Sequence, residues 1–318
     1  MAAIDLITAT RAGYALPASP NASLVSALIT GCSRAIQRYC KRWFVSQDFD
    51  ELYNGSADRR LLLRQYPITA VKSVRYRPVT VLKITNTLAN TPQARLEVTS
   101  TGLKLTRVTS GVTTTVTNGL DFAGNVKLSA LAAAVNAVGS SWSAQVVGDY
   151  NEWPSADLWC PNGPASDPYY TPAGQGALQC VAGSFAALKM HTYELAGYQI
   201  DARHGWLLRA IPYTDPELLH PEDLIFPAGV NNFRVQYTAG FATVPDDVQE
   251  ACAEWVAALY NLSLRDPQIG HQVNTDGSAK GYGSLDEEVL AGRRTGPPGR
   301  VRALLAPYIR RSVNIGQS

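Results

Sequence analysis

Residues that build catalytic and metal sites are scarce in this sequence. It has four histidines and five cysteines among 318 residues. No histidine pair has the His-Glu-x-x-His spacing of zinc enzymes, and no cysteine pair has the Cys-x-x-Cys spacing of zinc sites. We therefore expect no metal ion, and we expect surface or hydrogen-bonded roles for His191, His204, His220 and His271.

Phosphate-binding and nucleophile motifs are missing as well. Gly281 and Gly283 lack the third glycine and the preceding strand of a dinucleotide fingerprint, and no glycine-rich loop ends in Gly-Lys-Ser or Gly-Lys-Thr. Ser184 lacks the second glycine of a nucleophile elbow. The adjacent carboxylates of Asp246 and Asp247 would point in different directions on a helix, which makes them poor acid and base partners. We predict that the protein is not an enzyme and uses no cofactor.

The sequence also lacks long apolar runs. No stretch of about eighteen residues stays apolar, so no transmembrane helix is predicted. The first residues lack the basic and apolar regions of a secretion signal, so the five scattered cysteines are expected to be reduced thiols made in a cytoplasm. Cys32 and Cys252 fall on apolar stripes and are predicted to be buried. Cys160 and Cys180 flank a Pro/Gly-rich loop, where a disulfide or metal role is a minor alternative.

Charge is nearly balanced but unevenly distributed. The chain has 28 Lys and Arg against 26 Asp and Glu, which argues against a surface built throughout to bind nucleic acid. From Arg293 to the C-terminus, however, there are six arginines and no acid. This segment is either a solvated tail or a contact for an acidic partner or for DNA.

Apolar residues at three- and four-residue spacing predict two long helices. The first begins near Ser19 and Pro20, and its apolar face comprises Val25, Leu28, Ile29, Cys32, Ile36, Tyr39 and Trp43. The second begins at Pro245, and its apolar face comprises Val248, Ala251, Cys252, Trp255, Val256, Leu259 and Leu262. A shorter helix is predicted over residues 300–311, where Pro307 would kink it. Asn54-Gly55 predicts a tight turn between two strands.

The composition changes between residues 79 and 183. Thr, Ser, Asn and Gly become frequent, charge becomes sparse, and alternating apolar residues predict strands at 96–99, 103–108 and 113–116. A helix of small residues is predicted at 126–138. We expect residues 82–183 to form a β-rich α/β module, inserted into a discontinuous core that consists of residues 1–81 and 184–318.

Aromatic residues gather in and beside the long loop of this predicted module. They are Trp142, Tyr150, Trp153, Trp159, Tyr169 and Tyr170. Aromatic side chains often anchor protein interfaces, so these six are candidates for a protein interface. Packing against the core of the module and stacking on sugars are the two alternatives.

Three segments, in order, resemble the phage head-tail connector or neck adaptor family. The string QRYCKRWF at residues 37–44 is similar to the end of the family's first helix, with Gln37 where Glu is common. LLLRQYPITAVKSV at residues 61–74 is similar to the family's leucine strand and the pattern after it. VQYTAGFATVPDDV at residues 235–248 is the third segment. Residues 82–183 have no counterpart, and residues 192–227 match loosely.

The resemblance implies an α+β fold, with a helical connector core and a small β-sheet that carry the inserted module. It implies a structural virion protein, made in the host bacterial cytoplasm and located at the head-tail interface. Copies would form a homo-oligomeric, dodecameric ring beneath the portal, which extends the DNA channel and provides the platform for tail attachment. The implied partners are the portal protein, a tail or stopper protein, and DNA contacted without sequence specificity, with no membrane.

In such proteins the C-terminal segment reaches toward the portal. Residues 291–318 are therefore expected to form a mobile basic arm, so that a chain ending at Leu290 would stay folded but lose portal binding. A disordered solubilising tail is the alternative. The candidate portal-binding residues are Arg293, Arg294, Arg300, Arg302, Leu304, Leu305, Tyr308, Arg310 and Arg311.

Two other functions stay open. The chain could be a tail or baseplate component whose β-rich insert binds a host-surface glycan, which a flat aromatic patch would favour. It could also be a cell-wall hydrolase, which an open cleft with paired carboxylates would favour.

Overall fold

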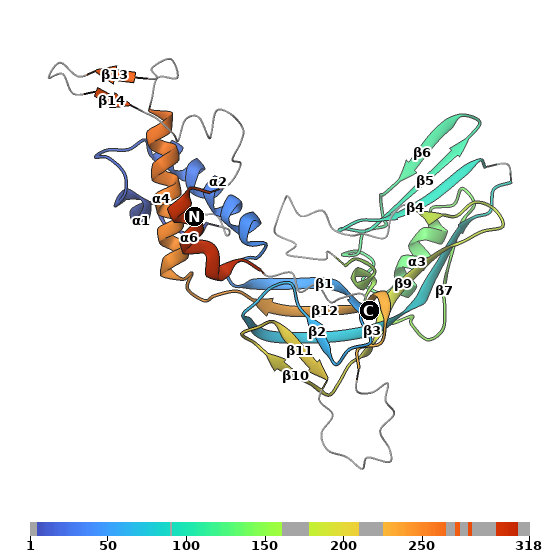
Figure 1. Cartoon of the computed structure of the whole chain (residues 1–318). Helices are drawn as coiled ribbons and strands as arrows, with labels where there is room; N and C mark the ends of the chain where they lie inside the picture. The colour runs from blue at the N-terminus through green and yellow to red at the C-terminus, as the bar shows by residue number, and fades with distance from the viewer. Residues whose placement is uncertain are drawn as a thin grey trace, which may run out of the picture. The chain divides into compact units, whose positions relative to one another are not determined.

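The computed structural model describes most of the chain, and its elements are mainly strands in antiparallel sheets (Figure 1). The described residues are 5–89, 91–160, 178–209, 225–264, 271–273, 279–281 and 297–310. The expectation of a helical connector core with a small sheet is therefore wrong. The missing information was long-range strand pairing, which leaves little trace in local periodicity.

The chain divides into two compact units, each built from separate segments. The helical unit comprises Met1–Ser46, Arg64–Tyr66 and Gly240–Ser318, and the sheet unit comprises Gln47–Leu63 and Pro67–Ala239. The sequence placed a module boundary at residue 82, whereas residue 82 lies inside strand β3 (Ile68–Asn86). The units are described separately below.

In the helical unit, α2 (Ala22–Cys40) and α4 (Asp246–Ser263) confirm the two long helices predicted from apolar spacing. The side chain of Asn21 caps α2 by accepting from the N–H of Leu24, and Lys41 ends it with a φ of 55°. Cys32 and Cys252 are buried, as predicted. The unit also contains α1 (Ala9–Gly13), α6 (Gly299–Leu305), the 3-10 turn η4 (Ala306–Tyr308), and the hairpin of β13 (His271–Val273) and β14 (Ala279–Gly281).

A five-stranded antiparallel sheet dominates the sheet unit. Its order is β1 (Gln47–Gly55), β12 (Gly229–Ala239), β3 and β7 (Trp142–Val146), and β9 (Ala186–Glu194) pairs with β3. The turn predicted at Asn54-Gly55 is wrong, because both residues belong to β1. Glycine is required at Gly55 because a Cβ there would lie 1.7 Å from the carbonyl oxygen of Pro227.

Two smaller sheets complete this unit. One has the order β6 (Val112–Val116), β5 (Leu103–Thr109), β4 (Gln93–Val98) and β8 (Leu178–Gln179). The other has the order β10 (Tyr198–Asp201), β11 (Trp206–Arg209) and β2 (Arg60–Leu62).

Helix α3 (Leu128–Ala137) and the 3-10 turn η1 (Ser155–Leu158) also belong to the sheet unit. One apolar cluster joins α3 to strands of the five-stranded and four-stranded sheets, with members such as Leu82, Leu105, Leu131 and Leu188. Residues on both sides of the expected boundaries at 82 and 183 therefore share one core. Within the described residues, no helix is long and apolar enough to cross a bilayer.

Candidate functional site

One face of the five-stranded sheet carries a polar row across β1, β12 and β3. Asp50 lies opposite Gln236, which lies opposite Ser73, and two residues further along the strands Arg234 lies opposite Arg75. Residues opposite one another in antiparallel strands point to the same face, so these five side chains are neighbours. Buried polar groups need hydrogen-bond partners, which this row can find among its own members or in a neighbouring segment.

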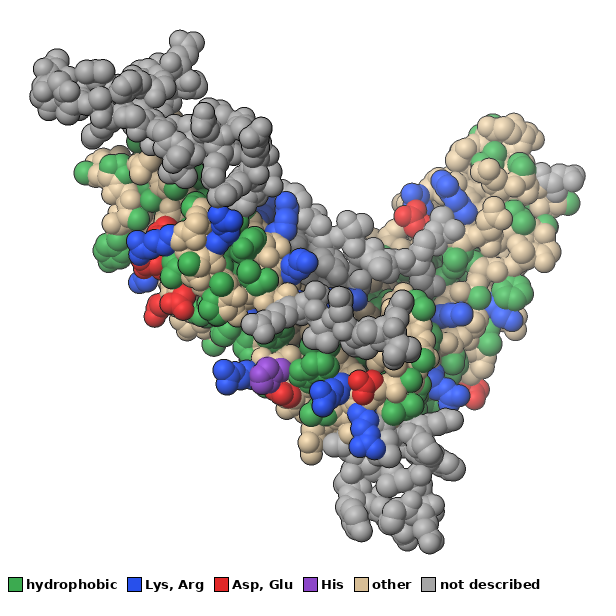
Figure 2. All heavy atoms as spheres, viewed as in Figure 1, with side chains coloured by type: hydrophobic (Ala, Val, Ile, Leu, Met, Phe, Trp, Pro, Cys, Tyr) green, Lys and Arg blue, Asp and Glu red, His purple; other side chains and the backbone are tan. Residues whose placement is uncertain are grey.

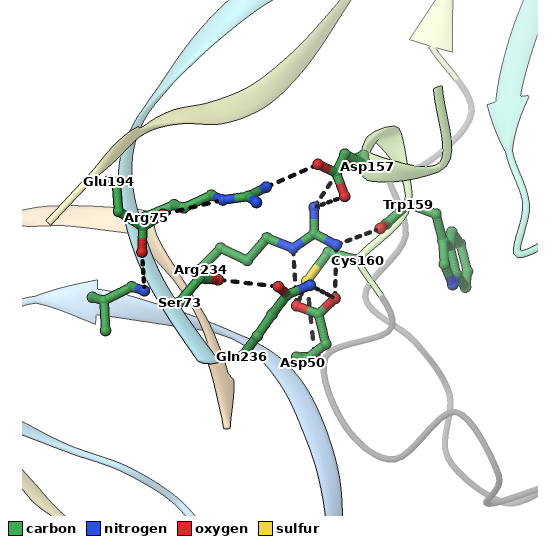
Figure 3. Close-up of polar contacts among 10 residues, drawn as sticks. Asp50, Ser73, Arg75, Asp157, Trp159, Cys160, Glu194, Arg234 and Gln236 are labelled. Atoms are coloured by element: carbon green, nitrogen blue, oxygen red, sulfur yellow. Dashed lines mark hydrogen bonds and ion pairs between the residues drawn. The ribbon is translucent and has the colours of Figure 1, made fainter. Parts of the chain in front are cut away.

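Arg234 is the centre of this site (Figure 3). Its side chain is 5% exposed, and its Nε and Nη2 donate to the two carboxylate oxygens of Asp50 at 2.9 and 2.7 Å. Nη1 donates to the carbonyl oxygen of Asp157 at 2.8 Å, and Nη2 also donates to that of Trp159 at 3.1 Å. The guanidinium is thus held by a bidentate carboxylate on one side and by two backbone carbonyls on the other.

A second layer of contacts surrounds the Arg234–Asp50 pair. Gln236 donates from Nε2 to Asp50 at 3.0 Å and accepts from the hydroxyl of Ser73 at 3.0 Å. Arg75 donates to the carboxylate of Asp157 at 2.8 Å and lies 3.4 Å from that of Glu194. Figure 3 shows these side chains converging from the sheet on Asp157 of η1 and on the segment that follows it. The network connects residues 157–160 to β1 and β3, near the start of the sheet unit's sequence, and to β12, near its end.

Burial and charge act in opposite directions on the ionisable groups here. Burial alone would lower the pKa of Arg234, but the hydrogen bonds and the charge of Asp50 outweigh it and raise that pKa above its ordinary value. Burial lowers the pKa of His191 on β9, although its Nε2 contacts the carbonyl oxygen of Asn231 at 2.8 Å. Arg234 is therefore a permanent cation, and His191 is neutral at pH 7.

The arrangement is suited to anchoring a chain segment. The thiol of Cys160 donates to the carboxylate of Asp50 at a sulfur–oxygen distance of 3.5 Å, so it acts as a hydrogen-bond donor. Within the described residues, no group of three or more His, Cys, Asp or Glu side chains could hold a metal ion. A guanidinium that contacts two carbonyls and a carboxylate fixes the position of a chain segment.

Sequence reasoning missed this site, although one signal was present. Arg234 stands between the apolar residues Phe233 and Val235 in strand β12, where apolar and polar residues alternate. A charge in a buried strand requires a partner, so the arginine itself indicated a carboxylate elsewhere. Its partner Asp50 lies 184 residues earlier in the chain, too far for any local pattern to identify it.

The aromatic residues predicted to form a protein interface pack inward where the structure describes them. Trp142 is buried, and Tyr150, Trp153 and Trp159 pack against the same apolar cluster. Tyr150 and Trp153 contact edge to face, with ring centroids 5.5 Å apart. Tyr169 and Tyr170 lie outside the described residues. The four described side chains therefore contribute to the core of the sheet unit.

The C-terminal segment 297–310 packs on the helical unit and is not a free arm. Leu305 is fully buried and Val301 is 1% exposed, and both belong to the apolar cluster of the helical unit. The backbone N–H of Arg310 donates to the carbonyl oxygen of Cys40 at 3.0 Å. The apolar stripe that was expected to face the portal instead faces the chain's own helices, so Leu305 is not available to a partner.

The other candidate portal-binding residues differ in their surroundings. Arg300 is 73% exposed and pairs with Glu254 at 2.9 Å, and Leu304 and Tyr308 are half-buried against the helical cluster. Arg302 and Arg310 are also partly exposed. Arg293, Arg294 and Arg311 lie outside the described residues. The described arginines of this set are thus the ones that can present charge to another molecule.

The three segments that resemble the connector family fall at defined places in this structure. The first spans the end of α2, the second runs from Leu61 in β2 into β3, and the third joins β12 to α4. No family model matches the chain, and no curated protein matches it. The resemblance therefore depends on these segments alone.

Thiol labelling gives a direct check of the cysteine environments. Burial raises the pKa of Cys32 and Cys252 to about 12, and that of Cys40 and Cys180 to about 11, whereas Cys160 is only half-buried. Because the thiolate is the reactive form and requires access to the reagent, we expect Cys160, the least buried cysteine, to be the one thiol that reacts in the native chain at pH 8, although its hydrogen bond to Asp50 slows it. Five thiols should react after unfolding, measured with Ellman's reagent. The variant Cys160→Ser should show none in the native state. Rapid modification of the other four would contradict the burial of those side chains.

Proposed function

We propose that this chain is a structural virion protein of a tailed phage, a head-tail adaptor that forms a ring beneath the portal. The observation that carries the proposal is the ordered set of three segments similar to the connector family. The ring would extend the DNA channel and provide the platform to which the tail attaches. Its partners would be the portal protein, a tail or stopper protein and further copies of itself, with the copy number matching the portal.

The contacts of these segments support treating them as one motif. Phe44 and Phe241 stack with ring centroids 6.4 Å apart, and the N–H of Phe241 donates to the carbonyl oxygen of Phe44 at 2.8 Å. Gly240 has a φ of +113°, and a Cβ there would lie 2.7 Å from the carbonyl oxygen of Val45. The glycine of the third segment is therefore needed for the close approach to the first segment.

The middle segment joins the same contacts in the helical unit. The side chain of Gln65 accepts from the N–H of Trp43 at 2.8 Å. The guanidinium of Arg42 lies 4.1 Å from the ring centroid of Tyr66, and burial lowers the pKa of Arg42. Residues from all three segments thus pack together although they are far apart in the sequence.

The two alternative functions have less support. A glycan-binding insert needs an exposed aromatic platform, but the described candidates Trp142, Tyr150, Trp153 and Trp159 pack on the core. A hydrolase needs a carboxylate free to act as acid or base, whereas Asp50 and Asp157 are engaged by Arg234 and Arg75. Contact with DNA in the channel would be to the backbone and would weaken with salt.

Reconstitution with the portal tests the proposal. The purified full chain, mixed with the portal protein of the phage that encodes it, should form a ring on one end of the portal in electron micrographs. Arg302→Glu and Arg310→Glu should weaken this complex, whereas the charge reversal Lys72→Glu in the sheet unit should not. A folded wild-type chain that forms no complex with the portal would refute the adaptor function.

A further inference from the structure

Strand β6 is an exposed edge of its sheet. It pairs with β5 only, and no strand in the described part of the chain pairs with its other side. Figure 1 shows the β5–β6 hairpin at the outer end of this sheet, and residues 112–115 are all exposed, with Val112 at 64%. The face seen in Figure 2 carries uncharged side chains at the tip of this hairpin.

This edge lacks the features that usually prevent strand pairing. Soluble proteins protect exposed edges with lysine, proline, a bulge or an inward-pointing charge. The sequence of β6 is Val-Thr-Thr-Thr-Val, without charge or proline, and its pairing with β5 runs without a register shift. All five residues are β-branched, which favours the extended conformation. The open edge of β6 can therefore pair with a further strand.

The hairpin turn determines which backbone groups face the open edge. Ser110 and Gly111 have φ values of 52° and 77° and form a two-residue turn between Thr109 and Val112. Such a turn directs the N–H of Val112 toward β5. Because backbone groups alternate along an antiparallel strand, the N–H and C=O groups of Thr113 and Thr115 point to the open edge.

The sequence of β6 reads the same in both directions. In an antiparallel pair of two copies centred on Thr114, Val112 lies opposite Val116 of the second copy, and Thr113 lies opposite its Thr115. Thr113 and Thr115 are the residues whose backbone groups face the edge, so this register makes them the hydrogen-bonded pairs. Every cross-strand pair is then Val with Val or Thr with Thr, and no like charges meet.

We propose that β6 pairs antiparallel with β6 of a second copy of this chain, which joins two four-stranded sheets across a two-fold axis. The contact is isologous and uses up both edges, so it gives a dimer and not a polymer. It differs from the head-to-tail contact of a ring and is tested without the portal, so its failure leaves the proposed adaptor function untouched. A five-residue strand buries little surface, so the dimer is weak.

Cysteine cross-linking tests the register. In a Cys160→Ser background, Thr114→Cys places two thiols on a directly opposed, non-hydrogen-bonded pair, with Cα atoms about 4.5 Å apart, which a disulfide can span. Thr113→Cys is the matched control, because the two thiols that it introduces would be offset by two residues and lie about 8 Å apart. Mild oxidation should convert the Thr114→Cys protein to a covalent dimer many times faster than the control. Equal rates would overturn the proposal.

Light scattering after size-exclusion chromatography tests the pairing itself. The wild-type chain should shift toward a dimer as concentration rises, and Thr115→Pro, which removes an outward N–H, should stay monomeric. Thr115→Ala keeps that N–H and should still dimerise. A wild-type chain that stays monomeric at the highest attainable concentration, or that forms open-ended polymers, would overturn the proposal. If Thr115→Pro does not fold, the cysteine pair decides.

Discussion

Replacing Arg234 with methionine is expected to lower the free energy of unfolding of the sheet unit by about 3 kcal/mol, at the lower end of the range for breaking a buried ion pair. The change removes the two hydrogen bonds from Arg234 to the carboxylate of Asp50 and the donors to the carbonyls of Asp157 and Trp159, while Gln236 still donates to Asp50. The side chain of Asp50 is 18% exposed, so water can partly solvate its charge, which limits the loss of stability. Urea unfolding followed by circular dichroism measures the difference.

Two variants separate the role of Arg234 from a general effect of charge. Arg234→Lys keeps the charge but cannot form the two parallel hydrogen bonds, so most of the loss should persist. Lys72→Met breaks the exposed pair with Asp48, where the side chains are 52% and 65% exposed, and should cost less than about 1 kcal/mol. An Arg234→Met protein as stable as the Lys72→Met protein would show that the network does not stabilise the fold.

Ending the chain at Leu290 is expected to destabilise the helical unit, the opposite of the result expected from the sequence. The truncation removes Val301 and Leu305, whose side chains are buried in the helical cluster. At about 1.5–3 kcal/mol for each fully buried aliphatic side chain, the loss should be about 3–6 kcal/mol. Chemical unfolding of the truncated and full-length chains provides the comparison.

Point variants distinguish packing from the loss of the whole segment. Leu305→Ala should cost about 2–5 kcal/mol because it leaves a cavity in the cluster. Ala303→Ser, at an exposed position of α6, should be nearly neutral. If the truncated chain and Leu305→Ala both unfold like the wild type, α6 does not contribute to the core. Portal binding is then better tested with Arg302→Glu and Arg310→Glu, since truncation would confuse lost binding with lost folding.

Local features could be predicted from the sequence because they depend on neighbours within a few residues. The apolar spacing of residues 25–36 and 248–256 predicted α2 and α4. The alternating apolar pattern predicted β5 and β6 to within a few residues. The sequence also predicted the burial of Cys32 and Cys252, because each falls on an apolar stripe that must face other helices.

The candidate site and the sheet that holds it were beyond the reach of sequence patterns. Arg234 and Asp50 meet because β12 pairs with β1, although the two residues are 184 positions apart. No local pattern in either strand indicates which strand it pairs with. The sequence also allowed three roles for the aromatic residues of the predicted interface: protein contact, core packing and stacking on sugars. The positions of β3, β4 and α3 show that the described ones pack on the core. Each of these outcomes depends on which surfaces are left for a side chain once distant strands have paired.

The sequence by itself determined the long helices, the burial of Cys32 and Cys252 and the absence of the common catalytic motifs, because composition and short-range periodicity encode these directly. The tertiary structure alone decided that sheets dominate, that Arg234 holds residues 157–160, and that α6 packs on its own chain. The physical reason is that an apolar stripe or a buried charge specifies only that a partner must exist. The partner is determined by the long-range packing that leaves the least apolar surface exposed to water and the fewest polar groups without hydrogen bonds.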